Sequence, residues 1–282
     1  QKARYKGAHT MLKVSWLANF DGFGFYLFFL IPKKKDALLL KPEPIVTNSY
    51  ENSWCMVKFS SNGSFDLTDK RSGLVYRNLH YLEDQADGGD GYDFYAIPGD
   101  KPITTLQGSA KILGEKTPFG AIFKIQYIIT LPASLSEDRV KRSEITIPQI
   151  VRSKIRIMDH TPTIEISTKL ENQIKDHRLR AVFPTPLKSD KVAAGSIFDV
   201  VERGIGIEGQ GPFDRWVQQA EPTSHTSNFV DLYQPTVGSM ALFNKGMPEY
   251  EARGYEGGVE LIQTLFRSVA FEGGNLPTRG GA

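Results

Sequence analysis

Cysteine is almost absent from this sequence, since Cys55 is the only one among 282 residues. A single thiol excludes an intrachain disulfide and a zinc site built from several cysteines. A reducing compartment fits this composition best, although one cysteine is also compatible with secretion. A chain of this length buries a large core without disulfides or metals, so size alone requires no cofactor.

An excess of one charge sign is also missing. The 34 Lys and Arg residues nearly balance the 32 Asp and Glu residues, which gives a formal net charge of +2. The basic residues form one run, Lys33–Lys35, which follows Pro32 and is typical of a solvated turn. A nucleic-acid partner needs a clustered basic patch, so the sequence predicts none.

No hydrophobic run is long enough and clean enough for a membrane span. The most apolar stretch, residues 14–31, carries Asn19, Asp21, Gly22 and Gly24 in its middle. An ionisable group at the centre of a bilayer is costly. We therefore expect two strands broken at Asp21-Gly22 and no membrane partner.

A sustained helical repeat is absent too, and alternation of apolar and polar residues takes its place. It is clearest in residues 155–157 and 164–170, with the turn formers Asp159-His160-Thr161-Pro162 between them. Further strands are expected at residues 122–131, 178–183, 196–201, 240–243 and 259–269. The pattern predicts an all-β protein, either a β-sandwich or a larger assembly of two antiparallel sheets.

Two turns and the chain ends complete the predicted organisation. Asn62-Gly63 predicts a tight two-residue hairpin turn, and residues 69–73 turn the chain again. We expect residues 1–45 to hold a lead-in and leading strands, and residues 46–282 to form one β domain. The start at QKAR and the stop at TRGGA suggest a piece of a longer protein, with some C-terminal strands missing.

Residues 81–100 form an acidic, glycine-rich loop without a basic residue, YLEDQADGGDGYDFYAIPGD. A calcium loop of the helix-loop-helix kind has no matching register here, although a looser calcium site from Asp84, Asp87 and Asp90 stays open. Two carboxylates about 5 Å apart would suit a retaining glycosidase, but spacing alone does not establish that distance. The third interpretation is a shaped loop that presents one side chain, Tyr92.

The order of several motifs resembles the C-terminal β region of glycoside hydrolase family 38, the α-mannosidases. These motifs are Glu51-Asn52, Asn62-Gly63, Asp69-Lys70 with Gly73, and Gly88–Tyr92. The resemblance continues through residues 176–180, FPTP at 183–186, His225, and residues 228–232, 246–252, 264–269 and 276–279. It covers roughly residues 50–282 and is similar to the bacterial branch of the family, which implies a bacterial, cytoplasmic protein.

The resemblance implies a large antiparallel supersandwich, related in shape to galactose mutarotase. It also implies that zinc, the Asp nucleophile and the acid/base carboxylate belong to an N-terminal domain of the parent enzyme. None of the five histidines here begins the His-x-Asp pair that the family's zinc site uses. We therefore expect no catalytic residue and no cofactor in this chain, zinc in the parent enzyme, and no activity from this chain alone.

For substrate binding, the resemblance implies Tyr92 and Asp90. Tyr92 would line the sugar site at the interface with the N-terminal domain, where an α-mannoside binds, and a phenol suits a sugar hydroxyl. Asp90 would fix the loop by accepting backbone amides. Arg178 and Arg180 are expected to pair with carboxylates such as Glu171 or Glu202.

The pairs Asp159-His160 and Asp176-His177 are read as structural, because neighbouring side chains on a strand face opposite sides. Two other functions stay open. One is a carbohydrate-binding or oligomerisation module without a part in the sugar pocket, which leaves a homo-oligomer open. The other is a self-contained mutarotase-like epimerase, although the sequence lacks a convincing histidine and carboxylate pair for it.

Overall fold

A computed structural model describes residues 16–31, 42–206 and 221–269. The chain divides into two units, Gln1–Leu39 and Leu40–Ala282. In the first unit the described residues 16–31 form no strand, so the predicted two strands are wrong for this part. The chain bends there at residues 22–24, directly after Asp21, and Gly22 has a φ of 146°. Lys33–Lys35 lie outside the described residues.

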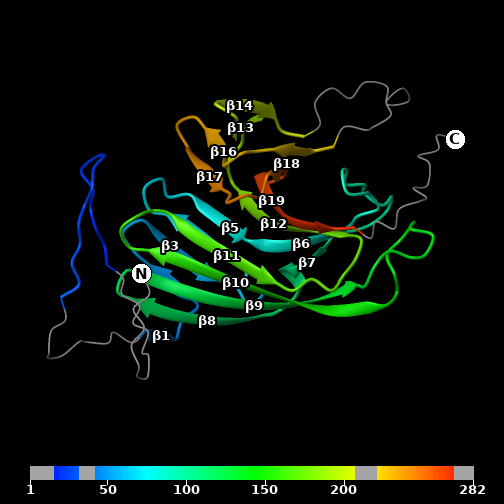
Figure 1. The fold of residues 1–282 in the computed structure, drawn as a ribbon, viewed down its shortest axis with the longest axis horizontal. Coiled ribbons are helices and arrows are strands. Elements are labelled where there is room, and N and C mark those ends of the chain that lie inside the picture. Colours follow the sequence, from blue (N-terminus) through cyan, green and yellow to red (C-terminus); the bar gives the residue numbers. More distant parts are fainter. Residues whose placement is uncertain (1–15, 32–41, 207–220, 270–282) are drawn as a thin grey trace, which may run out of the picture. The chain divides into compact units, whose positions relative to one another are not determined.

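The described part of the second unit holds nineteen strands and one 3-10 helix, Thr105–Gln107, in four sheets (Figure 1). The five-stranded sheet has the order β1 (Glu43–Ile45), β8 (Ala110–Thr117), β9 (Gly120–Pro132), β10 (Thr146–Met158) and β11 (Ile164–Leu170). The six-stranded sheet has the order β15 (Thr223–His225), β18 (Glu249–Tyr255), β19 (Gly258–Ser268), β12 (His177–Thr185), β6 (Tyr81–Ala86) and β7 (Ile103–Thr104).

Two four-stranded sheets complete the unit. One has the order β14 (Asp199–Gly204), β13 (Lys191–Ser196), β16 (Phe229–Gln234) and β17 (Gly238–Phe243). The other has the order β2 (Ser49–Glu51), β3 (Cys55–Phe59), β4 (Phe65–Asp69) and β5 (Val75–Leu79). Every strand pairing is antiparallel, so the predicted all-β, antiparallel fold class is confirmed. No helix in the described residues has the length and apolar character needed to cross a membrane.

Most predicted strands and turns are confirmed, with two differences. The hairpin at Asn62-Gly63 joins β3 to β4, and Gly63 has a φ of 88°, but residues 60–64 form a longer loop than the expected two-residue turn. The predicted strand 196–201 is wrong, because the chain reverses between β13 and β14. Phe198 makes this turn with a φ of 57°, a conformation that its bulky side chain gives no reason to expect.

The six-stranded sheet contributes to two hydrophobic cores. Its strands β6 and β12 place Leu82, Leu179 and Ala181 in the larger core, together with residues of β3, β4, β5, β9 and β10. Its strands β18 and β19 place apolar residues in a smaller core with β13 and β16. One face of this sheet is therefore apolar.

The opposite face of the same sheet is charged. Residues alternate between the two faces of a strand, so Glu83 on β6 lies on the face opposite Leu82. Cross-strand pairing places Arg180 beside Glu83 on one side and beside Thr264 on the other. Despite its charges, this face is buried, with 1% of Arg180 and 3% of Glu83 exposed.

Candidate functional site

The predicted site residues Tyr92 and Asp90 lie in the loop that connects β6 to β7. Asp90 accepts hydrogen bonds at Oδ1 from the backbone amides of Tyr92, at 2.8 Å, and Asp93, at 2.9 Å. This is the local role expected for Asp90, since a short acidic side chain satisfies the amides of its own turn. Tyr92 stands out from the loop with 91% of its surface exposed. The loop therefore presents this phenol, while contact with a substrate remains a prediction.

Asp87 fixes the first part of the same loop from the inside. Its Oδ1 accepts the amides of Gly89, at 2.9 Å, and Tyr95, at 3.2 Å. Its Oδ2 accepts a hydrogen bond from Nε of Arg267 at 2.7 Å. The side chain of Asp87 is fully buried, so each of its oxygens needs such a donor. Gly89 is required, because an added Cβ would lie 1.9 Å from the carbonyl oxygen of Asp93.

A second cluster holds the base of the loop, around Asp84. Arg142 donates from Nη1 to Asp84 at 2.5 Å and from Nε to Asp100 at 2.8 Å. His177 contacts the other oxygen of Asp84 through Nδ1 at 2.5 Å, and its Nε2 contacts Asn172 at 3.0 Å. His177 is buried in this cluster, and its carboxylate partner is Asp84 from β6. The structural role predicted for His177 stays a prediction.

The looser calcium site considered for Asp84, Asp87 and Asp90 does not assemble. Asp84 is bound by Arg142 and His177, Asp87 by Arg267 and backbone amides, and Asp90 by backbone amides. The three carboxylates are engaged by protein donors and serve different parts of the loop. The described residues hold no group of three or more His, Cys, Asp or Glu side chains placed to bind a metal.

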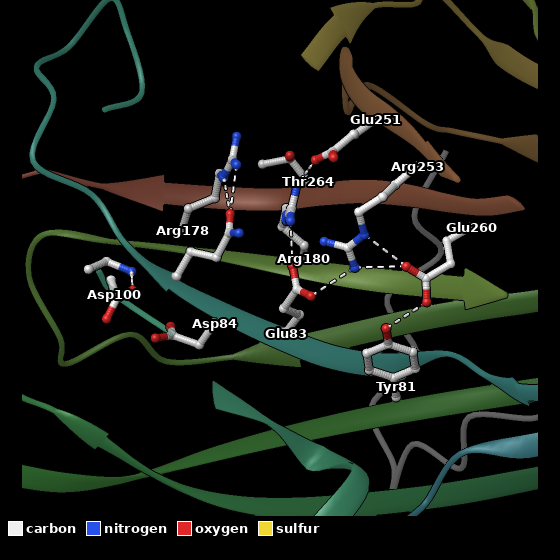
Figure 2. A network of polar contacts seen from close by, with 12 residues as sticks. Tyr81, Glu83, Asp84, Asp100, Arg178, Arg180, Glu251, Arg253, Glu260 and Thr264 are labelled. Carbon is white, nitrogen blue, oxygen red and sulfur yellow. Dashed lines mark hydrogen bonds and ion pairs between the residues drawn. The ribbon is translucent and has the colours of Figure 1, made fainter. Parts of the chain in front are cut away.

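Beside the loop, the charged face of the six-stranded sheet forms a continuous network (Figure 2). Arg180 donates to Glu83 on β6 and to Glu251 on β18. Arg253 donates to Glu83 at 3.0 Å and to Glu260 at 2.9 Å. In Figure 2 the carboxylate of Glu83 lies between the two guanidinium groups, so each cation shares a carboxylate with its neighbour.

This network controls the ionisation of its members. Burial alone would raise the pKa of Glu83, but the charges and hydrogen bonds of Arg180 and Arg253 outweigh burial and lower it. Tyr81 donates to Glu260 at 3.0 Å, and burial together with that carboxylate raises the pKa of the phenol. A carboxylate held ionised between two arginines is a poor proton donor at neutral pH. The face has the chemistry of a structural ion network.

Arg178 continues the network toward the loop. It donates to Gln85 at 2.7 Å and to Glu249 at 3.2 Å, and its guanidinium lies 3.4 Å from the ring centre of Phe94 in the loop. Burial, followed by the nearby charge of Arg180, lowers the pKa of Arg178 to about 10.

The predicted partners of the two arginines were wrong. Arg178 pairs with Glu249 and Arg180 pairs with Glu83 and Glu251, whereas Glu202 lies near Lys191 at 3.6 Å. The true partners come from strands of the same sheet that are distant in sequence. The role of Arg267 was missed as well, because only the position of β19 beside the loop reveals it.

Zinc, which the resemblance implies for a parent enzyme, has no matching ligand set in the described residues. His80 is fully buried, and burial lowers its pKa to about 4, so its imidazole is neutral at pH 7. It lies beside Tyr127 and Thr168, without a carboxylate partner. Histidine and carboxylate ligands that converge on one point are needed for a zinc site. The residues described here do not fit that requirement.

Comparison with known proteins agrees with the fold. The model for the glycosyl hydrolases family 38 C-terminal domain matches residues 50–271. A protein of Halalkalibacterium halodurans, named provisionally as a mannosylglycerate hydrolase, is 27% identical over an alignment of 266 positions, and the match covers 87% of this chain and 28% of that protein.

Two crystal structures from Enterococcus faecalis are similar as well. One is an alpha-mannosidase, with a TM-score of 0.71 and 29% sequence identity. The match covers 83% of this chain and 27% of the alpha-mannosidase chain. The other is described as a protein in glycosyl hydrolase family 38, with a TM-score of 0.70 and 28% sequence identity. Here the match covers 83% of this chain and 28% of the other chain. The chain thus spans less than a third of the length of these relatives. Because the family model matches most of its length, the chain belongs to glycoside hydrolase family 38, and residues 50–271 correspond to the C-terminal domain of that family.

Proposed function

We propose that this chain is the C-terminal β region of a longer, zinc-dependent, retaining α-mannosidase. Family membership supports a glycoside hydrolase, since the family model matches residues 50–271. One relative is named as an alpha-mannosidase and another, provisionally, as a mannosylglycerate hydrolase. We therefore expect an α-mannoside as the substrate, and we propose a bacterial cytoplasm as the location.

The finer description of the fold belongs to the same proposal. We propose that the four sheets are a supersandwich of the galactose-mutarotase type. The support is that the six-stranded sheet contributes to both hydrophobic cores, as a sheet inside a larger sandwich does. The division of the chain into residues 1–45 and 46–282 also remains a prediction.

The catalytic groups are assigned to the part of the enzyme that precedes this chain. A retaining glycosidase needs one carboxylate as nucleophile and a second as acid and base, about 5 Å apart. In the described residues, the buried carboxylates of Glu83, Asp84 and Asp87 are held by arginine or histidine side chains. The oxygens of these carboxylates are engaged by protein donors and shielded from solvent, so they are not placed to attack a sugar. Zinc binding is likewise assigned to the N-terminal domain.

The observation that carries a direct role for this chain is the construction of the Tyr92 loop. Aspartate side chains bind its backbone amides, and Arg267 holds it from β19. Tyr92 nevertheless extends outward with 91% of its surface exposed. A firmly held loop with an exposed phenol is suited to contact a polar ligand at a fixed place, because the ring packs on a sugar face and the hydroxyl bonds to it. We assign Tyr92 to the mannoside pocket.

The test is Tyr92→Phe in the full-length enzyme, assayed with an aryl α-mannoside. We expect kcat/KM to fall about tenfold or more, as for loss of a hydrogen bond that stabilises the transition state. Tyr233→Phe is the matched control, because Tyr233 is 56% exposed on β16 and lies outside the loop. It should leave kcat/KM unchanged.

The alternative function makes the opposite prediction. In a carbohydrate-binding or oligomerisation module, Tyr92 has no part in the sugar pocket. An unchanged kcat/KM for Tyr92→Phe would therefore favour that module and remove Tyr92 from the active site.

A further inference from the structure

Arg267 sits at the end of β19 and reaches three separate groups of the Tyr92 loop. Its Nε donates to Asp87 Oδ2 at 2.7 Å. Its Nη2 donates to the carbonyl oxygens of Asp90 at 3.0 Å and Asp93 at 2.6 Å. These acceptors lie before and after Tyr92 in the sequence, so one planar guanidinium ties both sides of the turn to the sheet.

The contacts of Arg267 coincide with the loop's own hydrogen bonds. Asp87 uses its other oxygen to bind the amides of Gly89 and Tyr95, and Asp90 binds the amides of Tyr92 and Asp93. Arg267 therefore adds the connection that the loop cannot make by itself, from its turn to a strand of the core sheet.

The neighbour of Arg267 in the sheet also favours its contact with an acidic loop. Register pairs Arg267 on β19 with Arg178 on β12, and like charges at paired positions repel each other. The loop supplies two groups that help to offset this repulsion, beside Glu249 of β18, which pairs with Arg178. Asp87 binds Arg267, and the ring of Phe94 lies 3.4 Å from the guanidinium of Arg178. Folding of the loop and pairing of these two strands are thus coupled.

We propose that Arg267 is a positioning residue for the reaction, which acts through Tyr92. It does not touch the sugar; it fixes the turn from which the phenol extends. This inference rests on the proposed function, because it assumes that Tyr92 contacts the mannoside. Lysine cannot replace it, since a single ammonium group lacks the fork that reaches a carboxylate and two carbonyl oxygens together.

Two variants remove the connection in different ways. Arg267→Lys keeps the charge and loses the fork. Asp87→Asn keeps Oδ1 for the amides of Gly89 and Tyr95 but places an NH₂ group opposite Nε of Arg267. The second variant serves if the first fails to fold. The matched control is Arg253→Lys, an ion-paired arginine on the same face of the same sheet that contacts Glu83 and Glu260 instead of the loop.

The experiment is a double-mutant cycle in the full-length enzyme, measured as kcat/KM for an aryl α-mannoside. We expect Arg267→Lys to lower kcat/KM about fivefold or more, and Arg267→Lys combined with Tyr92→Phe to match Tyr92→Phe alone within about twofold. Asp87→Asn should behave like Arg267→Lys. Arg253→Lys should combine multiplicatively with Tyr92→Phe, whatever its own effect.

A second readout reports on the loop directly. Amide hydrogen exchange at Tyr92 and Asp93, which donate to Asp90, should accelerate at least tenfold in Arg267→Lys and stay unchanged in Arg253→Lys. Unchanged exchange in Arg267→Lys would overturn the inference.

The activity cycle separates the two proposals. If Tyr92→Phe lowers activity and Arg267→Lys lowers it multiplicatively, the inference fails and the proposed function stands. If Tyr92→Phe has no effect, the role of Tyr92 fails, and the role of Arg267 in the reaction fails with it.

Discussion

At the scale of single residues, the most demanding position is Arg180, a cation with 1% of its surface exposed between two buried carboxylates. A charge in such a place is tolerated only when it is paired. Removal of one partner lowers the free energy of unfolding by more than the net contribution of the ion pair, because the remaining charges stay buried without a counter-charge. Arg253 supports Glu83 from one side but does not reach Glu251.

Arg180→Met should therefore lower the free energy of unfolding by about 3–5 kcal/mol. The control is Arg156→Met, which breaks a pair with Glu165 in which the side chains are 42% and 46% exposed, and which should cost at most about 1 kcal/mol. Urea denaturation of both variants measures the difference. Equal losses would show that burial adds nothing to the pair.

His80 makes stability depend on pH. Burial lowers its pKa from 6.5 to about 4, so the unfolded chain takes up the proton first as the pH falls. Neutral His80 makes its full contribution to the free energy of unfolding above pH 6.5. This contribution is lost as the pH falls toward 4, and the loss amounts to about 3 kcal/mol.

The variant His80→Asn tests this dependence. His80 has a φ of 61°, a conformation that asparagine adopts readily. Between pH 7 and 4.5, the variant should lose less stability than the unchanged protein in urea denaturation. His160→Asn, at an exposed turn position, should lose as much as the unchanged protein. Parallel pH profiles for all three proteins would contradict the assignment to His80.

At the scale of elements, the loop between β6 and β7 combines a tight backbone with an exposed tip. Two of its glycines differ sharply in their surroundings. An added Cβ at Gly89 would lie 1.9 Å from the carbonyl oxygen of Asp93, whereas one at Gly91 would meet no atom within 4 Å. The same substitution thus probes the loop at a crowded and at an open position.

Gly89→Ala should destabilise the protein by about 1–3 kcal/mol and open the loop to proteases. Gly91→Ala should change neither property by a measurable amount. Thermal unfolding and limited proteolysis of the two variants provide the comparison. Similar behaviour of the pair would mean that the turn at Gly89 and Asp93 relaxes without cost.

The elements also show what sequence patterns predict well and where they fail. Alternation located β9, because a strand between core and solvent records its two faces in its residues. The strands β12 and β19 were also located, although β12 is buried on both faces. It failed at residues 196–201, where Phe198 turns the chain with a positive φ. In the site, the role of Asp90 was predictable, because its partners are two and three residues away. The partners of Arg180 are 97 and 71 residues away and depend on strand order, which no local pattern contains.

At the scale of the whole molecule, this chain covers 27–28% of the length of its structural relatives. The buried carboxylates of its charged sheet face are paired with arginines, and its described residues bring no metal ligands together. Both observations are consistent with the proposed function, which assigns the catalytic and zinc-binding groups to another part of the enzyme.

The isolated 282-residue chain should fold and should not hydrolyse an aryl α-mannoside, even with added zinc, while the full-length enzyme does. Elemental analysis should find less than one equivalent of zinc per isolated chain. Hydrolysis by the isolated chain would place the catalytic carboxylates within these 282 residues. Zinc at one equivalent would place a metal site in this part of the enzyme.

The position of β12 in the sheet has a consequence for biosynthesis. This strand pairs with β6, which the ribosome makes earlier, and with β19, which it makes later. When Arg180 leaves the ribosome, Glu83 is already present, but Glu251 lies 71 residues further along the chain. Until that stretch is made, β12 has one open edge and Arg180 lacks one of its two carboxylates. The most buried strand of the sheet therefore gains its second neighbour late in synthesis. While that edge is open, the nascent chain is prone to aggregation and benefits from chaperones.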